Sequence, residues 1–360
     1  MRNGGRRIVN FTVTNFCNAS CVYCSFHKEP DKKMVSPADA RRAIDYLSEN
    51  EVGMLSLTGG EPLLNPGLPD MVRHAARRDM LVFTGTNGIL LTKELAARLK
   101  EAGLSSMWIS YESDSPQEFE KNRGVPGLHK RVGQAARDLR AAGLDFYAIA
   151  LINKSLRDVG AFADRLLEMG FDKVKFDYPM GFELQSTYRG WSRSPLLKYS
   201  GDDMARMVDS ILRLKRGGRI RVLNPVGGLL GARSFFKGEG GRFPCYAGEK
   251  ILYMDVDLDI YRCPALAEKL GSVGDELDFG RKECDLCYYQ GVRDFGSFYY
   301  LLETVGSVGR AMSGGAFVRP GRLLRALADA NDLRGNMTGI AGGEKHPREG
   351  LPQGGRDGHR

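Results

Sequence analysis

The sequence predicts an α/β protein: a partial (β/α)6 barrel followed by a small, cysteine-rich α+β appendage. Strand-like and helix-like segments alternate through roughly the first 220 residues, and six strand-like segments occur there. Such alternation favours a parallel sheet with helices outside it. Six units are too few for a closed eight-unit barrel, so we expect an open barrel with its site at the carboxyl ends of the strands.

Each expected strand is short and apolar, and most of the expected helices have start or stop signals. The strands are expected at residues 8–13, 54–57, 80–83, 107–110, 146–151 and 174–176. The helices are expected to begin at Ser36-Pro37 and to cover residues 68–78, 93–102, 128–142 and 158–169. Ser36 can cap the first helix, and a glycine follows each of the last three. Residues 178–243 are expected to be irregular, apart from one helix around 203–216.

The chain is expected to divide into three parts. We expect a barrel core with its linker at residues 1–223, an appendage with C-terminal helices at 224–334, and a disordered tail at 335–360.

Composition and charge limit the class of protein. The sequence contains no run of about 18 apolar residues, so no membrane-spanning helix is expected. The basic N-terminus leads into a strand rather than a signal peptide, so we expect a cytoplasmic protein. The net charge of +8 comes without a nucleic-acid-binding motif, so no nucleic-acid partner is expected.

Seven cysteines fall into two groups that are far apart in the chain, and an odd number excludes a complete disulfide framework. The first group, Cys17-x3-Cys21-x2-Cys24, directly follows the first expected strand. Three thiolates can bind three irons of a cubane cluster and leave the fourth iron open to a ligand. Zinc is the alternative, although zinc usually takes four ligands and the nearby candidate for the fourth is His27.

A second motif, Thr58-Gly59-Gly60-Glu61-Pro62, ends the second strand, one βα unit after these cysteines. Glycines allow a backbone to approach a ligand closely, and both loops should share one rim of the barrel. The two motifs together resemble the radical S-adenosylmethionine (SAM) superfamily. The resemblance implies a [4Fe–4S] cluster on the first cysteine group, with SAM bound to it. It implies SAM contacts by Tyr23, Gly59, Gly60, Glu61, Pro62, Asn87, Ser110, Glu112 and Arg123. Many relatives have Asp where this chain has Glu112.

The second group has the spacing Cys245-x17-Cys263-x20-Cys284-x2-Cys287. An Asp-rich turn at residues 255–259 predicts a β-hairpin between its first two cysteines. A hairpin, then a short helix, then a Cys-x2-Cys pair resembles the twitch appendage of radical SAM enzymes, a shortened form of the SPASM appendage. This resemblance implies one auxiliary [4Fe–4S] cluster with these four cysteines as ligands, and a zinc ribbon is the alternative. The chain has Asp259 where relatives usually have Gly.

The resemblance implies an enzyme of the oxidoreductase type that cleaves SAM to a 5′-deoxyadenosyl radical, with a flavodoxin or ferredoxin as reductant. We expect that radical to abstract hydrogen from a small-molecule or natural-product substrate, with net oxidation through the auxiliary cluster. A catalytic base would lie at the end of a strand. Among Asn153, Lys175, Asp177 and Tyr178, we choose Asp177.

Two other functions stay open. A peptide-modifying maturase often has a recognition domain before the barrel, and here the first strand starts by residue 8, which weakens that interpretation. A lipid-acting enzyme would make peripheral contact with a membrane, for which residues 298–302 and 319–327 have suitable apolar and basic side chains. Core packing explains these two segments equally well.

Overall fold

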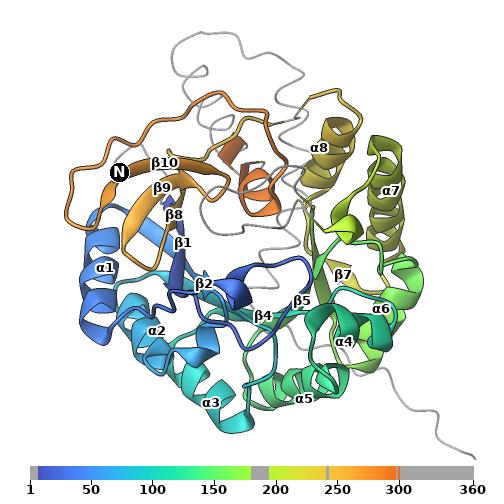
Figure 1. Cartoon of the computed structure of the whole chain (residues 1–360), viewed down its shortest axis with the longest axis horizontal. Coiled ribbons are helices and arrows are strands. Elements are labelled where there is room, and N and C mark those ends of the chain that lie inside the picture. Colours follow the sequence, from blue (N-terminus) through green and yellow to red (C-terminus); the bar gives the residue numbers. More distant parts are fainter. Residues whose placement is uncertain (1–6, 180–193, 241–242, 297–298, 301–360) are drawn as a thin grey trace, which may run out of the picture.

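The computed structural model describes residues 7–179, 194–240, 243–296 and 299–300, and a single curved sheet lies at its centre (Figure 1). The strands are β1 (Arg7–Thr14), β2 (Val52–Gly59), β3 (Leu81–Thr86), β4 (Ser106–Ser110), β5 (Phe146–Leu151), β6 (Lys173–Asp177), β7 (Arg221–Val222), β8 (Ile251–Met254), β9 (Asp259–Cys263) and β10 (Leu266–Ser272). Their order in the sheet is β10-β9-β8-β1-β2-β3-β4-β5-β6-β7. The six expected barrel strands are therefore confirmed as consecutive neighbours.

The appendage continues the barrel sheet instead of forming a sheet of its own. Strands β1 to β7 are parallel, and β8 pairs with β1 in parallel, with Val9 opposite Leu252. Strands β9 and β10 then run antiparallel to their neighbours. The expected hairpin is confirmed as β8–β9. The short helix expected after it is wrong, because residues 266–272 form the edge strand β10.

Helices cover the outer face of the barrel (Figure 1). They are α1 (Pro37–Glu49), α2 (Leu68–Ala76), α3 (Lys93–Ala102), α4 (Pro116–Arg123), α5 (Leu128–Ala141), α6 (Val159–Glu168), α7 (Gly201–Gly217) and α8 (Val226–Phe236), with 3₁₀ turns at Phe26–Lys28, Pro62–Leu64 and Pro195–Leu197. The Ser36 hydroxyl accepts a hydrogen bond from the Asp39 N–H, as expected of an N-cap. Gly103 ends α3 in the left-handed conformation, with φ of 98°.

Residues 178–243 hold more regular structure than we expected, because they include β7 and α8 as well as α7. The sequence of α8 contains Gly227, Gly228 and Gly231, which disfavour a helix in isolation. All three are buried, and the Tyr288 hydroxyl donates a hydrogen bond to the Gly228 carbonyl. Tertiary packing therefore stabilises this helix against its low propensity. Helix α4 was also missed, although Ser115 and the following proline form an N-cap signal.

Side chains of the barrel strands alternate between the outer core and the barrel interior. In β1, Val9, Phe11 and Val13 are fully buried in the hydrophobic core that includes the helices. Their neighbours Ile8 and Asn10 line a cavity inside the barrel. The cavity exists because several inward positions of the strands have small or polar residues.

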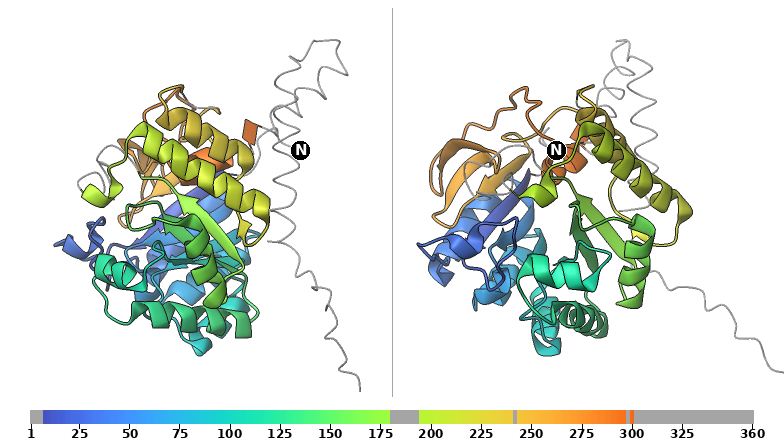
Figure 2. Two further views of the ribbon diagram at one scale, coloured as in Figure 1. Left: turned by 90° about the vertical axis from the view of Figure 1, so that its right-hand side faces the viewer. Right: turned by 45° about the vertical axis from the view of Figure 1, so that its right-hand side comes forward.

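A segment that follows the last cysteine lies between the hairpin and α8 (Figures 1 and 2). It includes a helical stretch at residues 290–296. On one side the Asn224 amide, just before α8, donates to Asp294 at 3.0 Å. On the other side Val292 packs in an apolar cluster with Ile8 and Tyr246. The segment thus connects the two ends of the barrel sheet.

The expected helices at residues 296–333 and the expected tail at 335–360 lie almost entirely outside the described residues. The same holds for most of the two segments proposed for membrane contact. Within the described ranges, no helix has the length and apolar character needed to cross a bilayer. The domain boundaries remain predictions.

Candidate active site

A cavity of about 960 Å³ lies inside the barrel and reaches the carboxyl ends of the strands. The cysteine loop after β1 and the Gly-Gly-Glu-Pro loop after β2 both border it, as the shared rim predicted. The predicted site residues on its lining are Cys17, Cys21, Tyr23, Cys24, Gly59, Gly60, Glu61, Pro62, Asn87, Ser110, Arg123 and Asp177. Glu112 is the predicted SAM contact that does not belong to this lining.

The two glycines of the second loop lie against the backbone that leads into the cysteine loop. The Gly60 N–H donates to the Thr14 carbonyl at 2.8 Å, and the Glu61 N–H donates to the Phe16 carbonyl at 2.8 Å. A Cβ atom on Gly60 would overlap the Phe16 carbonyl oxygen. Gly59, with φ of 132°, is equally close to Thr14. From the sequence, these glycines are expected to allow close contact with a ligand. In the structure, they allow close contact between two protein loops.

The Glu61 carboxylate links this loop to the loop after β3. Its Oε1 accepts the Thr86 hydroxyl at 2.8 Å, and its Oε2 accepts the Asn87 N–H at 2.8 Å. Burial raises the pKa of Glu61 to about 7, although these hydrogen bonds oppose the shift. A cationic group in the adjacent cavity would favour the ionised form. The loop therefore fits the ammonium group of SAM.

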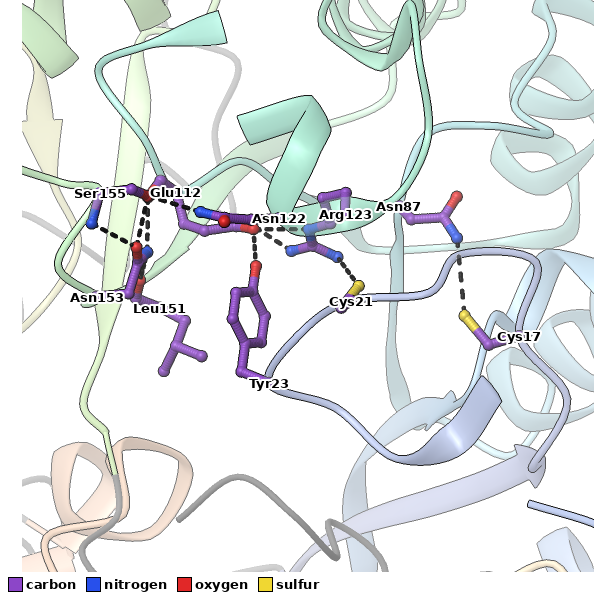
Figure 3. Close-up of polar contacts among 10 residues, drawn as sticks. All are labelled: Cys17, Cys21, Tyr23, Asn87, Glu112, Asn122, Arg123, Leu151, Asn153 and Ser155. Atoms are coloured by element: carbon purple, nitrogen blue, oxygen red, sulfur yellow. Dashed lines mark hydrogen bonds and ion pairs between the residues drawn. The ribbon is translucent and has the colours of Figure 1, made fainter. Parts of the chain in front are cut away.

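Contacts among Glu112 after β4, Arg123 at the end of α4 and Tyr23 tie the cysteine loop to the barrel (Figure 3). The buried Glu112 carboxylate receives Arg123 Nε and Nη2, each at 2.6 Å, and the Tyr23 hydroxyl. Arg123 Nη1 lies 3.6 Å from Cys21 Sγ. Glu112 is thus occupied by protein partners, and its predicted SAM contact remains a prediction. Arg123 still lines the cavity beside the cysteines.

The first cysteine group has the burial and polarity of a cluster-binding loop. Burial raises the pKa of Cys17 to about 11 and that of Cys24 to about 12, and the neighbouring thiols add to both shifts. Bound iron would reverse this preference, because a metal cation favours the thiolate. Asn87 Nδ2 lies 4.0 Å from Cys17 Sγ (Figure 3). The donor set fits a cluster with three thiolate ligands.

The fold also brings the four later cysteines into one neighbourhood. The charge of Cys284 raises the pKa of Cys245, and the charges of Cys245 and Cys263 raise the pKa of Cys287. Burial raises the pKa of Cys263 to about 11 and that of Cys287 to about 12. Four partly buried thiols fit an auxiliary cluster by number and chemistry. In the described part of the chain, no three His, Cys, Asp or Glu side chains are arranged around a single-ion site.

Strand β6 presents two charged side chains to the cavity on the side away from the helices. Lys175 and Asp177 line it, whereas Val174 and Phe176 are fully buried behind them. Burial raises the pKa of Asp177 to about 7, and the charge of Lys175 opposes the shift. Burial also lowers the pKa of Lys175.

The other two candidates for a base do not line the cavity. The Asn153 amide donates to the Glu112 and Leu151 carbonyls, and Tyr178 is buried against Phe236. Sequence reasoning missed another cavity carboxyl, Asp294, whose pKa burial raises to about 6. It lies far along the chain from β6, and no motif marks it.

A model of the radical SAM superfamily matches residues 11–174, the part of the chain that forms the barrel from β1 to β6. The chain contains a radical SAM domain. This family binds SAM and a [4Fe–4S] cluster, and its members among the relatives are enzymes. The expectation drawn from the cysteine loop and the Gly-Gly-Glu-Pro loop is confirmed at that level.

Similar proteins within the superfamily perform different reactions. An AdoMet-dependent heme synthase from Oleidesulfovibrio alaskensis is 30% identical over 142 residues, which are 39% of this chain and 37% of that protein. A GTP 3',8-cyclase from Peptoclostridium acidaminophilum is 32% identical over 227 residues, 59% of this chain and 66% of that protein. The chain spans about one third to two thirds of the length of these curated relatives.

A solved radical SAM structure shares the fold. Streptococcus suis SuiB bound to the precursor peptide SuiA aligns with a TM-score of 0.58 and 15% identity, over 75% of this chain and 63% of SuiB. At that identity the likeness concerns the fold alone.

Proposed function

We propose that this chain is a SAM-cleaving enzyme that oxidises a small-molecule substrate, with Asp177 as the proton acceptor. The observation that supports the proposal best is the position of Asp177. Its buried carboxyl borders the same cavity as the three-cysteine loop and the Gly-Gly-Glu-Pro loop. A carboxyl with a pKa near neutrality is well matched to accept a proton at physiological pH.

The residues around the cavity have separate tasks in this proposal. When SAM is bound to the cluster of the first cysteine group, it supplies a 5′-deoxyadenosyl radical that removes a hydrogen atom from the substrate. Glu61 receives the ammonium group of SAM, and Arg123 lies on the cavity wall where it can pair with the carboxylate. Glycine backbone contacts keep the two loops in register.

Oxidation of an alcohol carbon requires the loss of a hydrogen atom, a proton and an electron. The hydrogen atom leaves from carbon, and Asp177 accepts the hydroxyl proton. A cluster held by Cys245, Cys263, Cys284 and Cys287 would supply the acceptor for the electron. The charges of Lys175 and Asp294 both act on the Asp177 carboxyl. Lys175 lowers its pKa, and Asp294 raises it. Lys175 favours the ionised form that accepts the proton.

The test is Asp177→Asn, with a substrate identified by the increase it causes in 5′-deoxyadenosine formation. The parent should form product faster as pH rises through about 7, because the carboxyl of Asp177 is ionised above its pKa. The variant should still form 5′-deoxyadenosine with dithionite, but its product formation should fall about 100-fold or more, as for loss of a general base.

Asp172→Asn is the matched control, because Asp172 is an exposed carboxylate just before the same strand. It should retain the pH profile of the parent. A folded Asp177→Asn protein with normal product formation would exclude Asp177 as the base.

A peptide substrate is the second candidate. SuiB, which shares the fold, is bound to a precursor peptide in its structure. If short peptides and not alcohols increase 5′-deoxyadenosine formation by the parent, this second function replaces the first.

A further inference from the structure

Arg293 is the largest side chain that is fully buried in the described residues, with 1% of its surface exposed. It lies six residues after Cys287 in the helical stretch 290–296. Its Nη2 donates to the Cys284 carbonyl at 2.7 Å and its Nε to the Cys287 carbonyl at 3.1 Å. Its Nη1 donates to the Phe243 carbonyl, two residues before Cys245, at 2.9 Å. One guanidinium therefore holds the backbone on both sides of the second cysteine group.

The charge balance of Arg293 differs from that of the two comparable arginines. Arg123 and Arg262 each make a two-pronged ion pair with a glutamate, Glu112 and Glu268. Arg293 donates to three neutral carbonyls. Among the described residues, the carboxylate that pairs with it is that of Asp285, at 3.5 Å, on a side chain that is 75% exposed to solvent. A carboxylate so exposed offsets little of a buried charge.

The positive charge of the Arg293 guanidinium lies close to the second cysteine group. Two of the three carbonyls that the guanidinium contacts belong to Cys284 and Cys287. An iron–sulfur core held by four thiolates has a net negative charge, which would balance the buried guanidinium. Arg293 would thus serve a cluster in two ways. It fixes the backbone of the ligand loop, and its positive charge would compensate the negative charge of the cluster.

We propose that Arg293 is a positioning residue that raises the reduction potential of the auxiliary cluster. Reduction adds one negative charge to the cluster, and a buried cation beside it stabilises that added charge. The cluster then accepts the electron released by the substrate more readily. The inference rests on the proposed function, because it requires the second cysteine group to hold an iron–sulfur cluster.

The experiment uses the full chain with Cys17, Cys21 and Cys24 replaced by Ala, so that any remaining cluster is the auxiliary one. Arg293→Lys keeps the charge and loses most of the carbonyl contacts. Arg293→Gln loses the charge and keeps a donor. Each protein is reconstituted anaerobically, its iron and sulfide are counted, and its midpoint potential is measured by redox titration followed by electron paramagnetic resonance. Arg216→Gln removes the same charge from an exposed position of α7 and serves as the control.

We expect the potential to become more negative in Arg293→Gln, to stay near the parent value in Arg293→Lys, and to change little in Arg216→Gln. Loss of the cluster from the Gln variant but not from the Lys variant also supports the role of the charge. Equal potentials of the Lys and Gln variants, or loss of the cluster from both, overturn it. If the protein with Arg293 intact binds zinc without sulfide, the auxiliary cluster itself is refuted, which is a separate failure.

Discussion

Gly60 shows how a single atom can decide the geometry of the site. The residue borders the cavity, yet the group nearest to a Cβ atom there is the Phe16 carbonyl, just before Cys17. The place where SAM is expected to bind and the place where the cluster is expected to form are therefore coupled through one backbone contact.

Gly60→Ala should consequently disturb both cofactors. The added methyl group must displace Phe16, and Cys17 follows it in the chain. A strain of ~1.4 kcal/mol in the bound state is enough to weaken SAM binding about tenfold. We expect iron content to fall in the same variant, as measured by iron and sulfide analysis and by SAM titration.

Gly133→Ala is the matched control, because the nearest atom to a Cβ there is 3.7 Å away, an ordinary contact. It should bind iron and SAM as the parent does. If Gly60→Ala retains its iron and loses only SAM, the glycine serves the ligand directly, as the sequence alone suggested.

At the scale of elements, the loop after β1 depends on the end of β4 and on α4. The Ser20 N–H donates to the Arg123 carbonyl at 3.1 Å, and the Val22 N–H donates to the Asn122 carbonyl at 2.9 Å. The ion pair between Arg123 and Glu112 adds a side-chain link to the same junction. Protein contacts of its own therefore position the cysteine loop against α4.

Glu112→Gln tests that junction. Removal of one partner from a buried ion pair costs about 3–5 kcal/mol, because the other charge stays buried. Anaerobic denaturant unfolding should show a loss of that order, together with reduced iron in the first cluster. Glu101→Gln, at an exposed position of α3, should match the parent in both measurements. If the Glu112→Gln protein is destabilised but has a normal iron content, the ion pair stabilises the fold and is not needed for cluster assembly.

At the scale of the whole molecule, the second cysteine group and the barrel form one continuous structure. Strand β8 pairs directly with β1, and the segment after Cys287 reaches Asn224 before α8. Cys263 and Cys287 also belong to the same apolar cluster as Cys17 and Cys24. The two cysteine groups are far apart in sequence and adjacent in the fold, as transfer of an electron between substrate and auxiliary cluster would require.

Cys284→Ala combined with Cys287→Ala should separate SAM cleavage from turnover. Two of four ligands are lost, so about half of the iron of a protein with two four-iron clusters should disappear. The first cysteine group keeps its own ligands, so 5′-deoxyadenosine should still form with dithionite. Product should not form. Circular dichroism must first show a folded protein, since metal binding and folding are coupled. Normal product formation without the second cluster would contradict its redox role.

The sequence by itself determined the barrel strands, most of the helices and the two cysteine groups. These features depend on local signals: apolar alternation, serine caps, glycine stops and short cysteine spacings. It also placed Asp177 at a strand end, where a parallel sheet positions its site residues. Local patterns of this kind need no knowledge of distant residues.

Only the tertiary structure decided what depends on contacts between distant residues. It showed that α8 forms despite its glycines, that Glu112 pairs with Arg123, and that Asp294 joins Asp177 at the cavity. It also placed Arg293 on the carbonyls of Cys284 and Cys287. Burial and ion pairing are properties of the folded chain, because the partners come from segments that only the completed sheet brings together.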